Sequence, residues 1–216
     1  MPCPLIKQNI MQNAACRFAI SILWGSLFTS YFLQVSDCEV SLKYSILPKW
    51  VDSYNAEPNV TLRVCFSEDR CIKDDDVLSI PDIRDRPDVK MSGNGLDTSA
   101  SYMMCMLDAD ANNPHHPVYK PMLHWMVCDL PGDVNPHEDL GICGHTVKPY
   151  AHPGQWDSAK DVFGVHRMYT LLFKQERKMG YLDLELGAGS LNMRRFTKQF
   201  NLSYPVAGIS FHVDTK

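Results

Sequence analysis

Five short runs rich in β-branched, aromatic and other apolar residues recur along the sequence, and turn-forming clusters separate them. The runs are VTLRVCF (60–66), SYMMCML (101–107), LHWMVCD (123–129), HRMYTLLFKQ (166–175) and GISFHVD (208–214). Nearly all of the 14 prolines lie outside these runs, among Gly, Asn, Asp and Ser. Such runs bounded by turn residues are typical of strands. The sequence therefore predicts a mostly β fold with rigid connecting loops.

One segment favours a helix instead. In GSLNMRRFTKQFNL (189–202), Ser190 can cap the amino end, and Leu191, Phe196 and Phe200 recur near helical spacing. The methionines of SYMMCML are interpreted as core residues, because methionine fills irregular apolar space.

The first 36 residues differ in character from the rest. No charged residue stands between Arg17 and Asp37, and residues 18–33 are almost wholly apolar. This pattern predicts a secretory signal peptide with cleavage near Ser36 and a secreted domain over 37–216. An uncleaved signal anchor is the alternative, since the apolar stretch is about as long as a short membrane span. No later segment could cross a bilayer, so any other membrane association is expected to be peripheral at most.

The charge of the remaining chain excludes one class of partner. Without the leader it carries 19 Lys and Arg against 25 Asp and Glu, a net charge of −6. No Lys/Arg stripe interrupts this mildly acidic composition, so we expect no nucleic-acid partner. The length and the 45% hydrophobic content fit one globular domain.

An even number of cysteines follows the leader, which in a secreted chain predicts disulfides. Six cysteines allow fifteen connectivities. The favoured pair is Cys65 with Cys71, which would close the short loop FSEDR after VTLRV. Two N-glycosylation sequons begin at Asn59 and Asn201. The absence of a C-x-x-C pair argues against zinc, and the adjacent histidines His115 and His116 make a poor metal site. The six cysteines are Cys38, Cys65, Cys71, Cys105, Cys128 and Cys143.

Two carboxylates, Asp108 and Asp110, follow one apolar run, and His124 stands near the start of the next. Side chains two residues apart on a strand share a face. We therefore expect the carboxylates to point together, either at water or at a ligand.

Three longer stretches resemble the phosphatidylethanolamine-binding protein family, which includes Raf kinase inhibitor protein and the flowering-time regulators. They are LDADANNPHHPVYKPMLHWMVCDLPGD, GVHRMYTLLFKQ and RRFTKQFNLSYPVAGISFHVD. The resemblance runs from about Pro81 to Asp214. It implies a β-sandwich of mainly antiparallel sheets with a few short helices, and a small anion-accepting pocket built from acids and histidines.

The family motifs can be transferred residue by residue. The acids of the D-P-D-A-P turn match Asp108 and Asp110, and G-x-H-R-Y matches GVHRM. The resemblance implies these ligand-binding residues: Asp108, Asp110, Tyr119, His124, Pro153, Gly154 and His166. Arg167 is interpreted as structural, paired with one of the acids. No metal or cofactor is expected.

The sequence also departs from the family. Ala109 and Ala111 stand where the family has prolines, Met168 replaces a tyrosine, and the segment before His166 is longer. The chain ends at Lys216, without the C-terminal helix of many members. These changes leave the identity of the ligand open.

Two interpretations of the acids and histidines remain. Imidazolium donors suit a phosphate or carboxylate, and nearby carboxylates raise histidine pKa values, so we expect His124 and His166 to be charged near neutrality. Alternatively, the four residues form a buried network that fixes the strand ends.

Two functions are therefore weighed. The first is a secreted carrier of a phospholipid headgroup or another small anionic ligand. The second is a secreted protease inhibitor or another protein-interaction module of the same fold. Enzymatic activity is not expected, because no nucleophile stands in an elbow motif such as G-x-S-x-G. A regulator of cytosolic kinases is disfavoured by the leader.

Overall fold

The computed structural model describes residues 59–111, 113–115, 121–155, 164–180, 182, 184, 190–202 and 204–216. The predicted leader, Cys38, Tyr119 and His116 lie outside these residues. Within the described part, no helix is long and apolar enough to span a bilayer.

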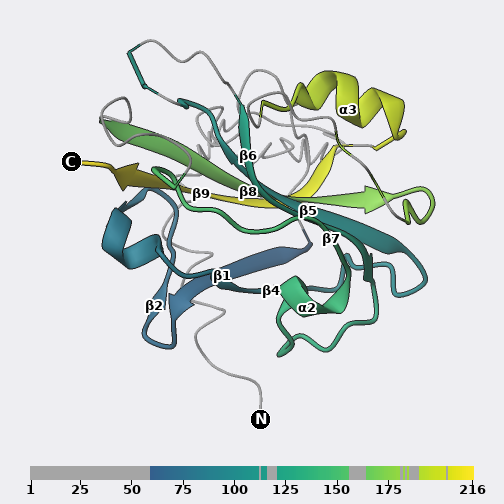
Figure 1. Cartoon of the computed structure of the whole chain (residues 1–216). Helices are drawn as coiled ribbons and strands as arrows, with labels where there is room; N and C mark the ends of the chain where they lie inside the picture. Colours follow the sequence, from purple (N-terminus) through teal and green to yellow (C-terminus); the bar gives the residue numbers. More distant parts are fainter. Residues whose placement is uncertain are drawn as a thin grey trace, which may run out of the picture.

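The strands form two sheets (Figure 1). The small sheet has the order β2-β1-β4, and the large sheet has the order β3-β9-β8-β5-β6-β7. The small-sheet strands are β1 (Thr61–Ser67), β2 (Arg70–Cys71) and β4 (Asp88–Ser92). The large-sheet strands are β3 (Asp76–Ser79), β5 (Ser101–Asp108), β6 (Met122–Pro131), β7 (His145–Lys148), β8 (Val165–Gln175) and β9 (Pro205–Asp214). Every pairing is antiparallel except that of β3 with β9.

Three short helices complete the described fold: η1 (Ile80–Ile83), α2 (Leu140–Cys143) and α3 (Met193–Gln199). The predicted fold class is confirmed, because mainly antiparallel sheets dominate and helices are few. All five predicted runs are strands. The strands that the sequence did not predict are β2, β3, β4 and β7, which have two to five residues and are too short to show a clear pattern.

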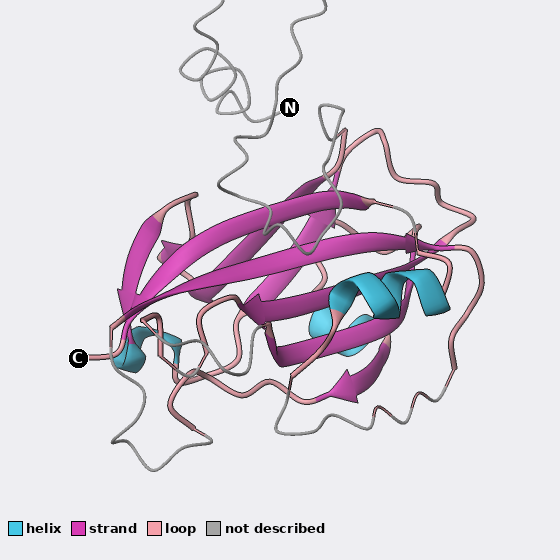
Figure 2. Ribbon diagram, turned by 90° about the horizontal axis from the view of Figure 1, so that it is seen from above, coloured by secondary structure: helices cyan, strands magenta, loops and turns pink. Residues whose placement is uncertain are grey.

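The large sheet is buried on both faces. One face packs on the small sheet, and α3 lies over the other, as Figure 2 shows from above. On β5, Tyr102, Met104 and Met106 enter the cluster between the sheets, whereas Met103 and Cys105 enter the cluster under α3. Because both faces of β5 are covered, its sequence is continuously apolar instead of alternating. The methionines are core residues, as predicted.

The predicted helix is confirmed, but its cap is not Ser190. Ser190 forms an isolated bridge with Met122, and the N–H of Leu191 donates to the carbonyl of Pro121. The chain is therefore still paired with the large sheet at these positions. Asn192 caps α3 instead, since its side-chain oxygen accepts from the N–H of Arg195 at 3.0 Å.

The predicted disulfide between Cys65 and Cys71 is present and joins β1 to β2. Cys105 and Cys128 are buried free thiols, and Cys143 is a half-buried one. Both sequon asparagines, Asn59 and Asn201, are exposed.

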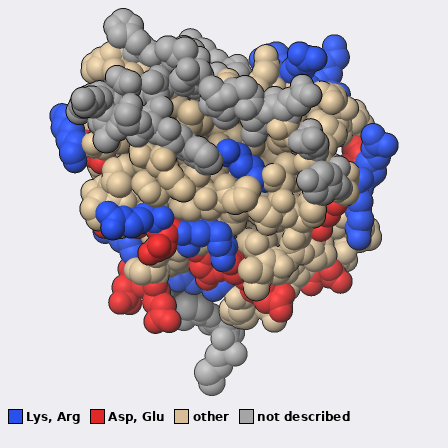
Figure 3. All heavy atoms as spheres, in the orientation of Figure 1, with Lys and Arg blue, Asp and Glu red and all other residues tan. Residues whose placement is uncertain are grey.

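Charged side chains of both signs lie among one another on the face drawn in Figure 3. Across the described part of this face they do not gather into a stripe of one sign.

Candidate functional site

Three inner strands of the large sheet, β8, β5 and β6, bring Asp108, His124 and His166 together at one end of these strands, and we call these three residues the Asp108 cluster. Asp108 is the last residue of β5, where it lies opposite Met122 on β6 and Met168 on β8. Side chains alternate along β5 and β8, so Asp108 and His166 lie on the face that packs on the small sheet.

A register shift in β6 places His124 on the same face. Met106 pairs with Trp125 while the next residue, Leu107, pairs with Leu123. His124 is therefore the extra residue of a β-bulge, and bulges re-aim side chains. Because of the bulge, the consecutive residues His124 and Trp125 face the same side of the sheet. Trp125 is part of the core between the two sheets.

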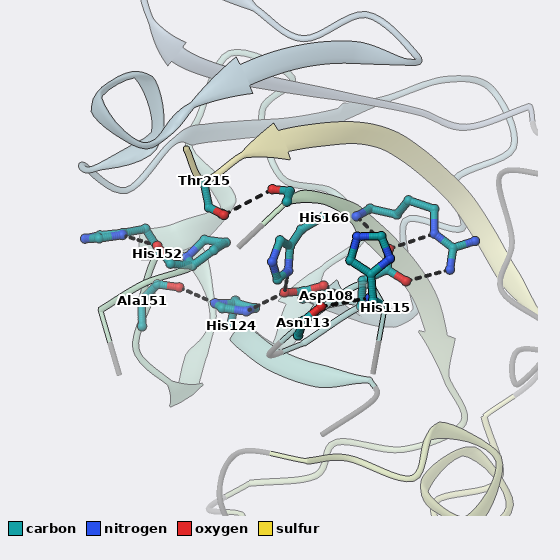
Figure 4. Close-up of polar contacts among 12 residues, drawn as sticks. Asp108, Asn113, His115, His124, Ala151, His152, His166 and Thr215 are labelled. Carbon is teal, nitrogen blue, oxygen red and sulfur yellow. Dashed lines mark hydrogen bonds and ion pairs between the residues drawn. The ribbon is translucent and has the colours of Figure 1, made fainter. Parts of the chain in front are cut away.

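The imidazole rings converge on one carboxylate oxygen (Figure 4). His166 Nδ1 lies 2.8 Å from Asp108 Oδ2, and His124 Nε2 lies 3.9 Å from the same oxygen. The other carboxylate oxygen, Oδ1, accepts from the N–H of Asp110 at 2.7 Å. All three side chains of the cluster are 1–2% exposed, so their polar groups are removed from bulk water.

The partners of each ring determine which nitrogen carries hydrogen. His124 Nδ1 lies 2.6 Å from the carbonyl oxygen of Ala151, and His166 Nδ1 lies 2.8 Å from Asp108. Both partners only accept, so each Nδ1 must donate. The Nε2 atoms of His124 and His166 are buried and have no hydrogen-bond partner among the described residues.

Asp110 does not share the face of Asp108. It follows the end of β5, where strand alternation no longer applies, and its carboxylate turns to Arg167. The backbone N–H of Arg167 donates to it at 3.0 Å, and the guanidinium donates at 2.8 and 2.7 Å. The two acids therefore have different hydrogen-bond partners, and the expected pairing of Arg167 with one acid is present.

The electrostatics differ from the expectation for His124. Its pKa is lowered from the usual value because burial disfavours the imidazolium, and this outweighs the favourable effects of Asp108 and the Ala151 carbonyl. The expectation that this imidazole is charged near neutrality was therefore wrong. Burial acts to raise the pKa of Asp110, but the hydrogen bonds from Arg167 outweigh it and hold that pKa below its ordinary value.

Two other predicted site residues, Pro153 and Gly154, lie in the segment that follows β7. The segment after β7 reaches His124 through Ala151, whose N–H also donates to the His124 carbonyl at 2.9 Å. Pro153 is buried and Gly154 exposed in that segment. Gly154 has a φ of +86°, which favours glycine. Tyr119 lies outside the described residues.

Two features of the site escaped sequence reasoning. One is the bulge at His124, and the other is the Ala151 carbonyl, 27 residues away in sequence. A backbone acceptor leaves no residue-type signal, so neither could be read from composition or spacing.

The described part of the chain contains no group of three or more His, Cys, Asp or Glu arranged to hold a metal ion.

Comparisons with known proteins point in one direction. A family model described as phosphatidylethanolamine-binding protein matches residues 68–210. Protein BROTHER of FT and TFL 1 from Arabidopsis thaliana is 30% identical over 155 residues, covering 72% of this chain and 80% of that protein. CEN-like protein 1 from Nicotiana tabacum is 29% identical over 167 residues, covering 77% and 87%.

Solved structures share the fold. A phosphatidylethanolamine-binding protein from Plasmodium vivax superposes with a TM-score of 0.60 at 16% identity, covering 78% of this chain and 92% of that one. A carboxypeptidase Y inhibitor, solved with its cognate proteinase, gives a TM-score of 0.58 at 22% identity, covering 74% and 86%.

Proposed function

The chain belongs to the phosphatidylethanolamine-binding protein family, and on that premise we propose that it is a secreted, non-enzymatic binding module. Its ligand is a small anionic group, such as a phosphorylated molecule or a phospholipid headgroup, held at the Asp108 cluster. Residues 1–36 are its signal peptide and 37–216 its binding domain. The Cys65–Cys71 disulfide supports this assignment to an oxidising compartment.

One observation carries the proposed ligand site. The Nε2 atoms of His124 and His166 are buried without a hydrogen-bond partner among the described residues. Burying a polar atom without a partner costs free energy, and such an atom calls for an explanation. A ligand oxygen that bonds to both rings would satisfy them, since a charged imidazole donates through Nε2.

The experiment uses the protein secreted into culture medium. Small molecules that co-purify with it are extracted and identified by mass spectrometry, and the stripped protein is titrated with glycerophosphoethanolamine at pH 5.5. A phosphorylated or lipid ligand in the extract, together with saturable binding, is the expected result. An empty extract together with no binding would remove this function.

Inhibition of a protease is a second candidate. The Ile142 side chain on α2 is 76% exposed, and an interface would bury such an apolar side chain. The fold is shared with an inhibitor that was solved in complex with its proteinase. A pull-down from culture medium separates the candidates, because an inhibitor should return with a protease and a carrier with its small ligand.

A further inference from the structure

The Asp108 cluster offers acceptors, not donors, when its rings are neutral. Each Nδ1–H already donates, to the Ala151 carbonyl in His124 and to Asp108 in His166. A neutral ring then has only a lone pair at Nε2. The oxygens of a phosphodiester also only accept, so an anion cannot bond to a neutral Nε2.

Burial holds the pKa of His124 below its ordinary value in the free protein, and Lys148 on β7 and His166 on β8 lower this pKa further. Among the described residues, Asp108 on β5 is the negative group that raises the pKa of this ring. Its carboxylate oxygen lies 3.9 Å from Nε2 and is already bonded to His166.

A bound anion reverses this balance. It places a second negative charge against Nε2, next to the Asp108 carboxylate, and opposite charges within a few ångströms favour the protonated imidazole. The protonated ring can then donate to the anion. Binding and protonation therefore stabilise each other and are thermodynamically linked.

Resting on the function proposed above, we propose that an anion bound at the Asp108 cluster brings a proton with it, held on Nε2 of His124. The ligand class is thus an anion together with a proton from solvent. The module loads in mildly acidic surroundings and releases its ligand as the pH rises.

Calorimetry in two buffers tests this without any substitution. Glycerophosphoethanolamine keeps a constant charge around pH 7.5, so a difference in binding heat between buffers of unlike ionisation enthalpy counts protons taken up by the protein. At pH 7.5, above the ordinary histidine pKa of about 6.5, we expect His124 to take up roughly one proton per ligand, and any proton that His166 needs in order to donate adds to that number. Affinity should fall about tenfold per further pH unit for each proton taken up, as linkage requires.

The variant His124→Gln identifies the group that carries the proton. Its amide presents an N–H that does not titrate, so the variant should take up about one proton fewer per ligand than the wild type, and its affinity should depend less steeply on pH between 6.5 and 8. The matched control His137→Gln changes an exposed histidine that follows the opposite end of β6 from His124 and should keep the wild-type uptake. Both proteins are checked by near-ultraviolet circular dichroism, which reports on the buried Trp125 beside position 124.

The outcomes separate this inference from the proposed function. Binding with no uptake by the wild-type protein would overturn the inference and leave the proposed function standing. Uptake that equals the wild-type value in a folded His124→Gln protein would place the proton on another group and overturn the assignment to His124. No binding between pH 5.5 and 8 would remove the proposed function, and the inference with it.

Discussion

Asp108 and Asp110 stand two residues apart and have different partners. Asp108 is within β5 and accepts from His166, whereas Asp110 lies past the end of the strand and is held by Arg167. The Asp110 side chain is 7% exposed and that of Arg167 is 54% exposed. At the residue scale, one acid belongs to the candidate site and the other fastens the turn after β5 to β8.

Arg167→Ala should destabilise the protein by about 1 to 2 kcal/mol at pH 7, because the largely buried Asp110 carboxylate loses its charged donors and only water can replace them. Urea unfolding measures the change. The pKa of Asp110 is held below its usual value, so this stabilisation is present above the unfolded pKa near 4 and is lost as the pH falls through the folded pKa.

The difference between wild type and Arg167→Ala should therefore shrink at pH 3. Arg177→Ala, which changes an exposed arginine just after the same strand, is the control and should change stability by less than about 0.5 kcal/mol. A difference that is equal at pH 7 and pH 3 would show that the ion pair does not carry the effect.

At the scale of elements, the sequence predicts the long strands and not their local irregularities. The runs at β5, β6, β8 and β9 are recognisable because they are long and apolar. The bulge that turns His124 toward Asp108 depends on the register in which β6 pairs with β5. That register depends on the sequences of both strands, so the pattern of one strand does not predict it. The start of α3 likewise moves from Ser190 to Asn192, because the bridge to β6 competes with helix formation.

The disulfide between β1 and β2 closes a short loop, with a sequence separation of 6. Replacing Cys65 and Cys71 with alanine should cost about 2 kcal/mol of stability through chain entropy. The control Cys143→Ser changes a half-buried free thiol and should leave the unfolding midpoint nearly unchanged. Peptide mapping of secreted protein without reduction should recover the Cys65–Cys71 pair, and six free thiols would contradict it.

Asp139 fastens α2 to β4 and to the loop before it. Its carboxylate accepts from the N–H of Gly141 at 3.0 Å and of Val89 at 3.1 Å, and pairs with Arg86 at 2.6 Å. Asp139→Ala should therefore destabilise the protein by about 2 to 3 kcal/mol in urea unfolding. The exposed Asp133 provides the control, and equal effects of Asp133→Ala and Asp139→Ala would contradict this role.

At the scale of the whole molecule, the fold class and the proximity of Asp108, His124 and His166 were within reach of the sequence. Asp108, His124 and His166 meet because they stand at the ends of three neighbouring strands of one sheet. The pKa of His124 was not within reach, since it is lowered by burial that only the packed sheets create. The role of Asp110 depended on where β5 ends, which a sequence pattern locates only to within a few residues.

The leader supports a prediction about the whole chain. If residues 1–36 are a signal peptide, N-terminal sequencing of the protein from its native source should begin near Asp37. The N-terminal sequence should be determined for the protein in the membrane fraction and in the culture medium of the same preparation. A product that begins at Met1 and is found only in the membrane fraction would favour the signal anchor.

The central claim is that His124 and His166 bind an anion beside Asp108, and the affinity for glycerophosphoethanolamine at pH 5.5 tests it most directly. Charged hydrogen bonds contribute about 1.5 to 3 kcal/mol, so His166→Ala should weaken binding roughly ten- to a hundredfold in isothermal titration calorimetry. The exposed-site control His137→Ala should bind like the wild type, and circular dichroism should show both variants folded. Equal affinity of wild type, His166→Ala and His137→Ala would contradict the claim and leave the Asp108 cluster as a network that only fixes the strand ends.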